Sequence, residues 1–164
     1  MKDGKQISTN LFSQFCGEKV RNVKLGHGSF ITMDFGCDVT VEVKTNRGIK
    51  KSTRGEWHLW IYMCAWRLDK DDIPLIGAND DREIITKELR ILENKKILKT
   101  SILNNAFDVL FEFEDDIKLL LFSFIVKDNE QWMLYTPDHK VFCAGREGSW
   151  TYESSSKSGS VNRK

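Results

Sequence analysis

The sequence predicts an α+β fold, mostly antiparallel β, in which two halves each begin with a helix and continue as strands. Two short segments have the apolar spacing of amphipathic helices, and strand-like runs separated by turn residues follow each of them. The 164 residues are 40% hydrophobic and include only two prolines, which is typical of a folded chain. We therefore expect one globular domain over residues 1–152, with repeat halves at 8–68 and 79–152.

Both expected helices carry boundary residues. Residues 8–17 open with a Ser-Thr-Asn run that can cap a helix and close with Gly17. The second helix starts with Asp80 or Asp81 as its N-cap and ends at Asn94. Its apolar residues recur three and four positions apart, so one helix face is expected to be buried.

The two halves repeat the same order of apolar residues, which indicates an internal pseudo-twofold duplication. Five positions keep a constant offset of 77: Phe12, Phe15, Val20, Leu25 and Phe30 correspond to Leu89, Leu92, Ile97, Ile102 and Phe107. One inserted residue later, Phe35, Val39, Val41 and Val43 correspond to Phe113, Ile117, Leu119 and Leu121. Hairpin turns are expected at 36–38 and 114–116, and residues 57–62 are expected to correspond to 131–135. The alternative is a chance match between two helix-then-strand runs, which predicts the same coarse structure.

Further strands follow from the local pattern. Residues 39–43 alternate between apolar and polar, as a strand with one wet face does. Residues 57–68 and 117–126 are nearly apolar throughout, so we expect them to be central strands covered on both sides. Turns at 136–140 and 145–149 precede two short strands, and the Ser-rich residues 153–164 are expected to form a disordered tail.

Composition excludes several functional classes. The chain has 25 basic and 24 acidic side chains, and this net charge of +1 provides no general attraction to nucleic acid or to an anionic membrane. No apolar run approaches the roughly 20 residues that span a bilayer, and the first residues lack the pattern of a signal peptide. A cytoplasmic location is therefore expected. Cys64 and Cys143, which lie in apolar surroundings, are expected to be buried free thiols.

No catalytic or metal-binding motif is present. The three histidines, His27, His58 and His139, lack metal-ligand spacing, and no paired C-x-x-C or phosphate-binding glycine loop occurs. We therefore expect no cofactor, no metal and no enzymatic activity. The alternative is an enzyme or a carrier of a small ligand, with an aromatic pocket around His58 formed by Trp57, Trp60 and Tyr62.

Charge is grouped along the chain, and the acidic groups are the candidate partner-binding residues, because grouped charge steers protein association. These residues are Asp69, Asp71, Asp72, Asp80, Asp81, Glu114, Asp115 and Asp116. Basic residues gather in one loop, at Lys44, Arg47, Lys50, Lys51 and Arg54. A third hypothesis is that this loop binds nucleic acid, but it lacks interleaved aromatic residues, so nucleic acid is not expected as a partner.

Residues 54–68, 132–138 and 145–150 resemble strand patterns of small bacterial proteins encoded beside polymorphic toxins. These include the immunity proteins of contact-dependent growth inhibition systems. The resemblance implies a cytoplasmic protein that binds one toxin domain and blocks its active site or substrate surface. Many such toxins are nucleases with positively charged clefts, which acidic groups would suit. The near-neutral total charge departs from that expectation, so another class of toxin stays open.

Overall fold

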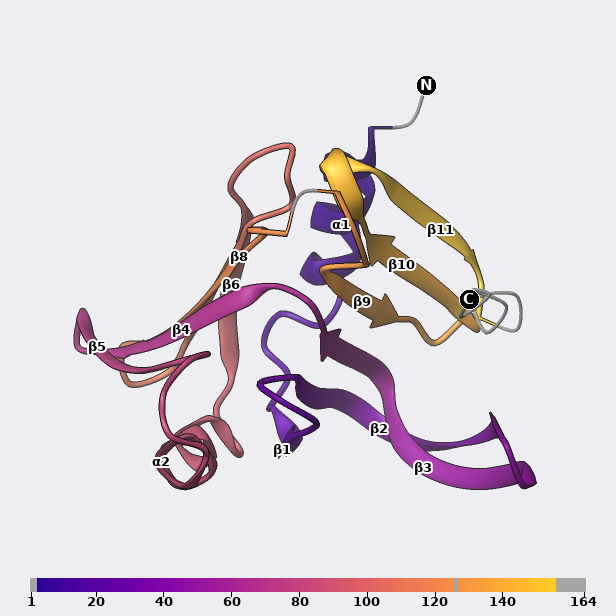
Figure 1. Cartoon of the computed structure of the whole chain (residues 1–164), viewed down its shortest axis with the longest axis horizontal. Helices are drawn as coiled ribbons and strands as arrows, with labels where there is room; N and C mark the ends of the chain where they lie inside the picture. Colours follow the sequence, from indigo (N-terminus) through magenta and orange to yellow (C-terminus); the bar gives the residue numbers. More distant parts are fainter. Residues whose placement is uncertain (1–2, 126, 156–164) are drawn as a thin grey trace.

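Eleven strands and two α-helices make up the part of the chain that the computed structural model describes, residues 3–125 and 127–155 (Figure 1). The N-terminal elements are α1 (Gly4–Ser13), β1 (Arg21–Leu25), β2 (Ile31–Thr45), β3 (Gly48–Ile61), β4 (Ala65–Lys70) and β5 (Ile73–Gly77). They are followed by α2 (Arg82–Glu88), the 3-10 turn η1 (Leu89–Leu92), β6 (Ile97–Ile102), β7 (Val109–Phe113) and β8 (Ile117–Phe122). The last are β9 (Trp132–Tyr135), β10 (Lys140–Ala144), the 3-10 turn η2 (Arg146–Gly148) and β11 (Trp150–Ser154). Every strand pair among them is antiparallel, so the predicted α+β, mostly antiparallel fold class is confirmed.

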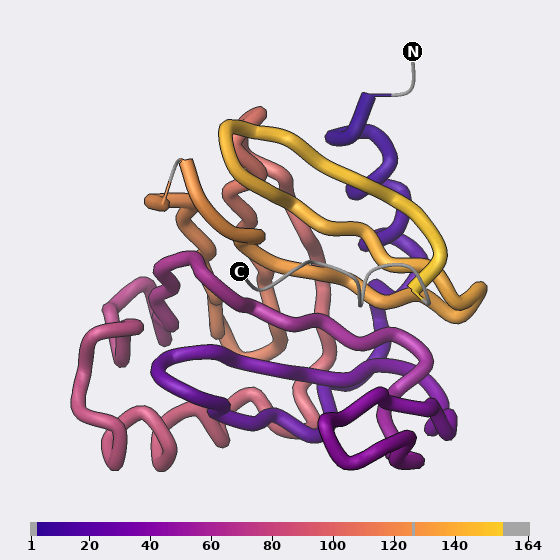
Figure 2. Tube along the Cα trace, turned by 45° about the vertical axis from the view of Figure 1, so that its right-hand side comes forward, coloured from indigo at the N-terminus to yellow at the C-terminus, as the bar shows by residue number. Residues whose placement is uncertain are grey.

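Each of the two sheets contains strands from both halves of the chain. The first sheet has the order β1-β2-β3-β9-β10-β11, and the second has the order β5-β4-β8-β7-β6. Each half forms a three-stranded meander in one sheet and then crosses to the other sheet. There, β4 pairs with β8 and β9 pairs with β3 (Figure 2). The halves are therefore interleaved, and neither builds a complete sheet by itself.

The segments that follow the two helices pair with each other, and we call this contact the crossing. At its centre, Lys19 pairs with Lys96 in an isolated bridge. These two lysines are themselves 77 positions apart. Four backbone hydrogen bonds surround the bridge: Gly17 N to Ile97 O, Asn94 N to Val20 O, Ile97 N to Glu18 O and Val20 N to Lys95 O. When 77 is added to the residue numbers of the first half and subtracted from those of the second, the first bond becomes the second and the third becomes the fourth. The crossing thus has local pseudo-twofold geometry, while the descent of both halves from one duplicated unit remains a prediction.

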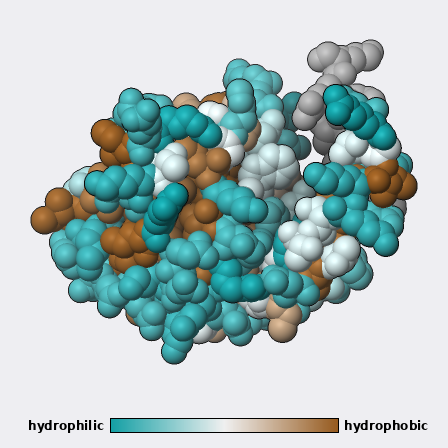
Figure 3. Space-filling view, turned by 90° about the horizontal axis from the view of Figure 1, so that it is seen from below, coloured by the Kyte–Doolittle hydropathy of each residue, from teal (hydrophilic) through white to brown (hydrophobic). Residues whose placement is uncertain are grey.

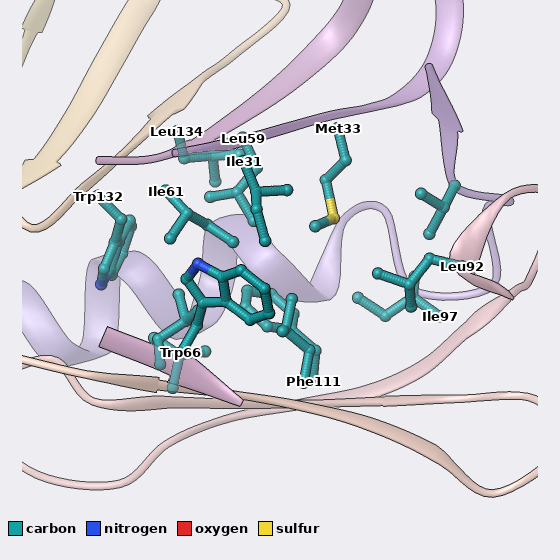
Figure 4. Packing of buried hydrophobic residues seen from close by; sticks show 14 of the residues in the cluster. Ile31, Met33, Leu59, Ile61, Trp66, Leu92, Ile97, Phe111, Trp132 and Leu134 are labelled. Carbon is teal, nitrogen blue, oxygen red and sulfur yellow. The ribbon is translucent and has the colours of Figure 1, made fainter. Parts of the chain in front are cut away.

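The core lies between the sheets (Figure 4). The helix α1 contributes the buried ring of Phe12 to it. The ring of Phe12 lies 5.3 Å from both Phe111 of the second sheet and Trp132 of the first. The indole N–H groups of two tryptophans donate hydrogen bonds: Trp66 Nε1 to Ser29 O at 2.7 Å, and Trp132 Nε1 to Phe107 O at 2.9 Å. Each indole comes from one sheet and bonds a loop that connects two strands of the other sheet, β1–β2 for Trp66 and β6–β7 for Trp132. This arrangement satisfies both buried N–H groups and ties the layers together.

The helices differ from prediction in their bounds. Asp3 caps α1, which ends at Ser13 well before Gly17, so the polar residues at 8–10 lie inside the helix rather than at its start. Of the two predicted N-caps of the second helix, Asp80 and Asp81, the structure has Asp81, whose side chain accepts a backbone hydrogen bond at 2.8 Å. That segment tightens into the η1 turn after Glu88, and Asn94 follows with a positive φ of 65°.

The predicted turn at residues 36–38 is wrong, because β2 runs through it. The pairing of β2 with β3 shifts between Phe35 and Asp38, so the extra residue forms a bulge and the hairpin closes only near Arg47. In the second half, a turn does lie at 114–116, between β7 and β8. Sequence patterns could not distinguish these cases, because Gly and Asp are common in both bulges and turns.

Two of the expected correspondences are also wrong. Residues 57–62 and 131–135 lie in adjacent strands of one sheet, where Leu59 pairs with Leu134. In strand order, β9 is the counterpart of β4, and β8 is the counterpart of β3. The residues that correspond to 117–121 are therefore those of β3 from Trp57 onward, not those of β2 from Val39 onward.

The apolar runs are central but are not covered on both faces. Residues 57–68 are divided between β3 and β4, and in β3 and β8 buried and partly exposed residues alternate. Cys64 is buried as predicted, whereas Cys143 is only partly buried. β11 extends to Ser154, so strand pairing continues two residues into the predicted tail, and residues 156–164 lie outside the described part of the chain.

Candidate functional site

The structure divides the predicted partner-binding carboxylates between different parts of the second sheet. Five of them lie in two hairpin turns at one end of this sheet: Asp71, Asp72, Glu114, Asp115 and Asp116. Asp69 lies within β4, while Asp80 and Asp81 lie beyond the other end of β5, before α2. The carboxylates of the turns at 71–72 and 114–116, which are far apart in the sequence, are thus brought together. Asp69, Asp80 and Asp81 lie away from them.

The two acidic turns are bonded to each other. Asp71 N donates to Asp116 O at 3.1 Å, and Lys70 Nζ donates to Asp115 O. Two successive positions in each turn have the left-handed backbone: φ is 53° and 60° at Asp71 and Asp72, and 59° and 53° at Asp115 and Asp116. Aspartate tolerates this conformation better than most side chains, so these residues also have a role in turn formation.

Three lysines are interleaved with these carboxylates. They form the ion pairs Lys118–Asp72 at 2.5 Å, Lys95–Asp115 at 2.5 Å and Lys70–Asp71 at 3.1 Å. The hydrogen bond from Lys95 holds the pKa of the Asp115 carboxyl below its ordinary value, and the bond to Asp72 raises the pKa of Lys118. Sequence reasoning missed Lys95 and Lys118, because their partners lie 20 or more positions away, whereas Lys70 is next to Asp71 in the sequence. The end of the sheet is therefore an ordered charge network with a modest acidic excess.

The other predicted carboxylates serve the local structure. Asp69 is 8% exposed and accepts from Arg67 Nε at 2.7 Å and Nη2 at 2.9 Å. Asp80 Oδ2 accepts from Gly77 N at 2.7 Å, which closes the turn after β5, and Asp81 caps α2. Because these side chains stabilise the turn, the helix start and the outer sheet face, they are weaker candidates for partner contact than the two turns.

Exposed apolar side chains lie along β5, which starts at one of the acidic turns, and on α2, which follows its other end. β5 is an edge strand, and its Ile73 is 68% exposed and directly follows Asp72. Leu75 on the same strand is 37% exposed, and Ile84 on the neighbouring α2 is 52% exposed. In Figure 3, hydrophobic surface gathers on the side of the molecule where β5 and α2 lie. We call the surface formed by Asp71, Asp72, Ile73, Leu75, Asp115 and Asp116 the acidic edge.

The aromatic pocket expected around His58 is not assembled. Successive residues of a strand point to opposite faces, so Trp57 enters the core while His58 and Trp60 lie on the outer face of the first sheet. The Tyr62 ring packs on that of Trp60 at 5.1 Å and on that of Phe30 at 4.6 Å. The four predicted lining residues thus do not face one common space.

His58 instead belongs to a hydrogen-bonded polar cluster around Asp34, which sequence reasoning did not find. Asp34 is 4% exposed, and its carboxylate bonds His58 Nδ1 at 2.6 Å and Asn22 Nδ2 at 2.9 Å. Burial raises the pKa of Asp34, but these hydrogen bonds outweigh it and the net pKa is lowered. On the same face, the Arg54 guanidinium lies 4.2 Å from the centre of the Tyr135 ring. These bonds join side chains of the adjacent strands β1, β2 and β3, so the cluster stabilises the sheet.

Two surface hollows, of about 740 and 760 Å³, adjoin α2. The second is lined in part by His27 and Arg82. Arg82 donates to Gly26 O at 2.8 Å and to Gly28 O at 2.7 Å, so its guanidinium holds the turn that carries His27. In the described residues, no hydrogen bond links His27 to a carboxylate or a nucleophile, and this hollow offers no assembled catalytic group.

Within residues 3–125 and 127–155, no three His, Cys, Asp or Glu side chains are grouped as a metal site would require. No helix in that part of the chain has both the length and the apolar character that spanning a bilayer requires. Comparison with protein-family models, with curated proteins and with solved structures found no match to this chain. The resemblance to immunity proteins therefore stays a prediction from strand patterns.

Proposed function

We propose that this chain is a non-enzymatic binding protein of the toxin-immunity type, which uses its acidic edge to bind one protein partner with a basic surface. The observation that carries the proposal is the side-by-side placement of the Asp71–Asp72 and Asp115–Asp116 turns next to exposed apolar residues of an edge strand. Such a surface offers an apolar contact and a charged surround in one place.

The carboxylates of the acidic edge are already ordered before a partner binds. Both turns are bonded to each other and to lysines, so their carboxylates lose little conformational freedom when a partner arrives. Ile73 and Leu75 give the partner apolar area to bury, and large exposed apolar side chains on an edge strand otherwise favour aggregation. The five carboxylates of the two turns exceed the three lysines, so a basic partner is attracted.

The proposal predicts that a large secreted protein is encoded next to this chain and that its C-terminal domain is the partner. The experiment co-produces that domain with this protein and measures rescue of bacterial growth, followed by the Kd of the purified pair. A chain with four Asp→Asn substitutions at residues 71, 72, 115 and 116 keeps the turns, because asparagine also tolerates a positive φ. We expect this variant to bind at least tenfold more weakly, which corresponds to about 1.4 kcal/mol.

A second variant, Ile73→Ser, removes the exposed apolar contact without touching the core. The matched control is Glu153→Lys on β11, an exposed residue of the first sheet. We expect Ile73→Ser to weaken binding by about 1–2 kcal/mol and the control to leave the Kd unchanged. Full growth protection by the four-Asn variant, with an unchanged Kd, would refute the acidic edge as the binding site.

A further inference from the structure

The paired strands β2 and β3 extend far beyond their sheet. β1 pairs with β2 only as far as Asp34, and β9 pairs with β3 only from His58 onward. Between the pairs Asp38–Gly55 and Thr45–Gly48, the two strands pair only with each other. We call this two-stranded ribbon, residues 38–55, the arm; it projects at the lower right of Figure 1.

The fold does not require the arm. In the second half of the chain, the last core-facing pair of the corresponding hairpin, Phe113 with Ile117, is joined by residues 114–116 alone. In the first half, the corresponding pair, Phe35 with Trp57, is joined by residues 36–56. Residues 42–53 are all exposed and contribute nothing to the core. A long ribbon that buries no core surface indicates a function other than stability.

The base of the arm is firmly built. Gly36 has a positive φ of 74°, and a Cβ there would collide with the Glu56 side chain, whose Oε1 accepts from Cys37 N at 3.2 Å. Arg21 pairs with Asp38 at 2.9 Å and also donates to Gly36 O. These contacts fix the angle at which the arm leaves the sheet.

The distal part of the arm is uniformly basic. It carries Lys44, Arg47, Lys50 and Lys51, and no carboxylate occurs from residue 43 to residue 55. None of these four cations forms an ion pair in the described residues. This is unlike the lysines of the acidic edge, which are all paired. Their charge is therefore available to an anionic partner.

The cations occupy both faces of the ribbon. Lys50 is paired with Val43 on one face, while Lys51 is paired with Glu42 on the other, and Arg47 lies at the closing turn. A flat protein surface would meet one face only. A groove whose two walls are lined with phosphates would meet both. The major groove of B-form DNA, about 12 Å wide, admits a two-stranded β-ribbon.

We propose that the arm binds double-stranded DNA by lying in its major groove with its cations on the phosphates of both walls. The paired segment from Asp38 to Thr45 spans about 25 Å at roughly 3.3 Å per residue, which is long enough to follow the groove. Duplex binding needs no stacking aromatics, so their absence from the basic segment does not count against it. The proposal is independent of the acidic edge, which lies at the other end of the molecule (Figure 1).

The test measures fluorescence anisotropy of a labelled duplex of about 20 base pairs, titrated with the full chain. We expect a Kd on the order of 10⁻⁵ M at moderate salt and a slope of log affinity against log salt of about −4, from four phosphate contacts. The arm-less variant replaces residues 36–56 with Glu-Asp-Asp, the sequence that joins β7 to β8. It should fold and lose measurable binding.

Two substitution variants keep the test decisive if the arm-less chain does not fold. The four-fold variant Lys44→Gln, Arg47→Gln, Lys50→Gln and Lys51→Gln leaves the ribbon in place and should reduce affinity at least tenfold, while Lys51→Gln alone should reduce the slope by about 1. The control Lys87→Gln, on α2, should change nothing. Unchanged affinity in the four-fold variant would overturn the proposal. So would equal or tighter binding to single-stranded DNA, to poly-glutamate or to vesicles containing phosphatidylserine.

Discussion

The buried carboxylate of Asp34 offers the sharpest test of the energetics of this fold. Asp34→Asn keeps the shape of the side chain but removes the charge that holds His58 Nδ1 at 2.6 Å and Asn22 Nδ2 at 2.9 Å. Hydrogen bonds to a charged group contribute about 1.5–3 kcal/mol each, and the new amide presents a donor where an acceptor stood. We expect the substitution to lower the free energy of unfolding by about 2–3 kcal/mol at about pH 7.

The pH dependence identifies the charge as the cause. The folded pKa of Asp34 lies below its ordinary value of 3.8, so the stabilisation is complete above that value. It is lost as the pH falls through the lower folded pKa, because the carboxyl is then protonated in both states. Urea unfolding curves, followed by tryptophan fluorescence from about pH 7 downward, should therefore differ less between the two proteins once the pH falls below 3.8.

The matched control is Asp38→Asn, which removes an exposed carboxylate that pairs with Arg21 at 2.9 Å. An exposed pair contributes only about 0–1 kcal/mol, so this variant should unfold almost like the parent. A difference between Asp34→Asn and the parent that is the same at both ends of the pH range would refute the electrostatic reasoning. A loss no larger than that of Asp38→Asn at about pH 7 would refute it too.

Two further predictions concern packing and thiol reactivity. Gly55→Ala should lower the free energy of unfolding, measured in urea, by about 1–3 kcal/mol, because the new Cβ would lie 2.8 Å from the Cβ of Asp34. The control Gly26→Ala should be almost neutral, because its Cβ would lie 3.5 Å from the nearest atom. Equal losses in the two variants would contradict the packing argument. Exposed Cys37 should react with a disulfide reagent at about pH 8 in the native protein. Cys64, whose pKa burial raises to about 12, should react only on unfolding, and modification of both at one rate would show that Cys64 is accessible.

Local signals in the sequence predicted much of the secondary structure. Alternation of apolar residues predicted the strand at 39–43, Asp81 was one of two candidate helix caps, and the offset of 77 marked residues that are buried in both halves, such as Phe15 and Leu92. These features depend on neighbouring residues, so sequence reasoning could find them. The turn expected at residues 36–38 failed because a bulge and a turn use the same residue types, and only the strand partner distinguishes them.

The candidate site was predicted only in part. Asp71 and Asp115 were both identified from grouped charge. Their turns are bonded together only because β4 crosses into the sheet that contains β7 and β8, which local sequence does not reveal. Asp69 has the same charge and a similar position in the sequence, yet Arg67 binds it on the outer face of the sheet. Whether a carboxylate faces a partner or an internal cation is a long-range property, so composition cannot decide it.

The sequence by itself determined the α+β class, the order of the elements and the grouping of charge, because each follows from residues close together in the chain. The tertiary structure alone decided that the strands of the two halves exchange between sheets and that two acidic turns meet at one end. It also decided that the basic segment is a free ribbon with cations on both faces. The physical reason is the pairing of strands, which joins residues far apart in sequence and sets the direction of every side chain along them.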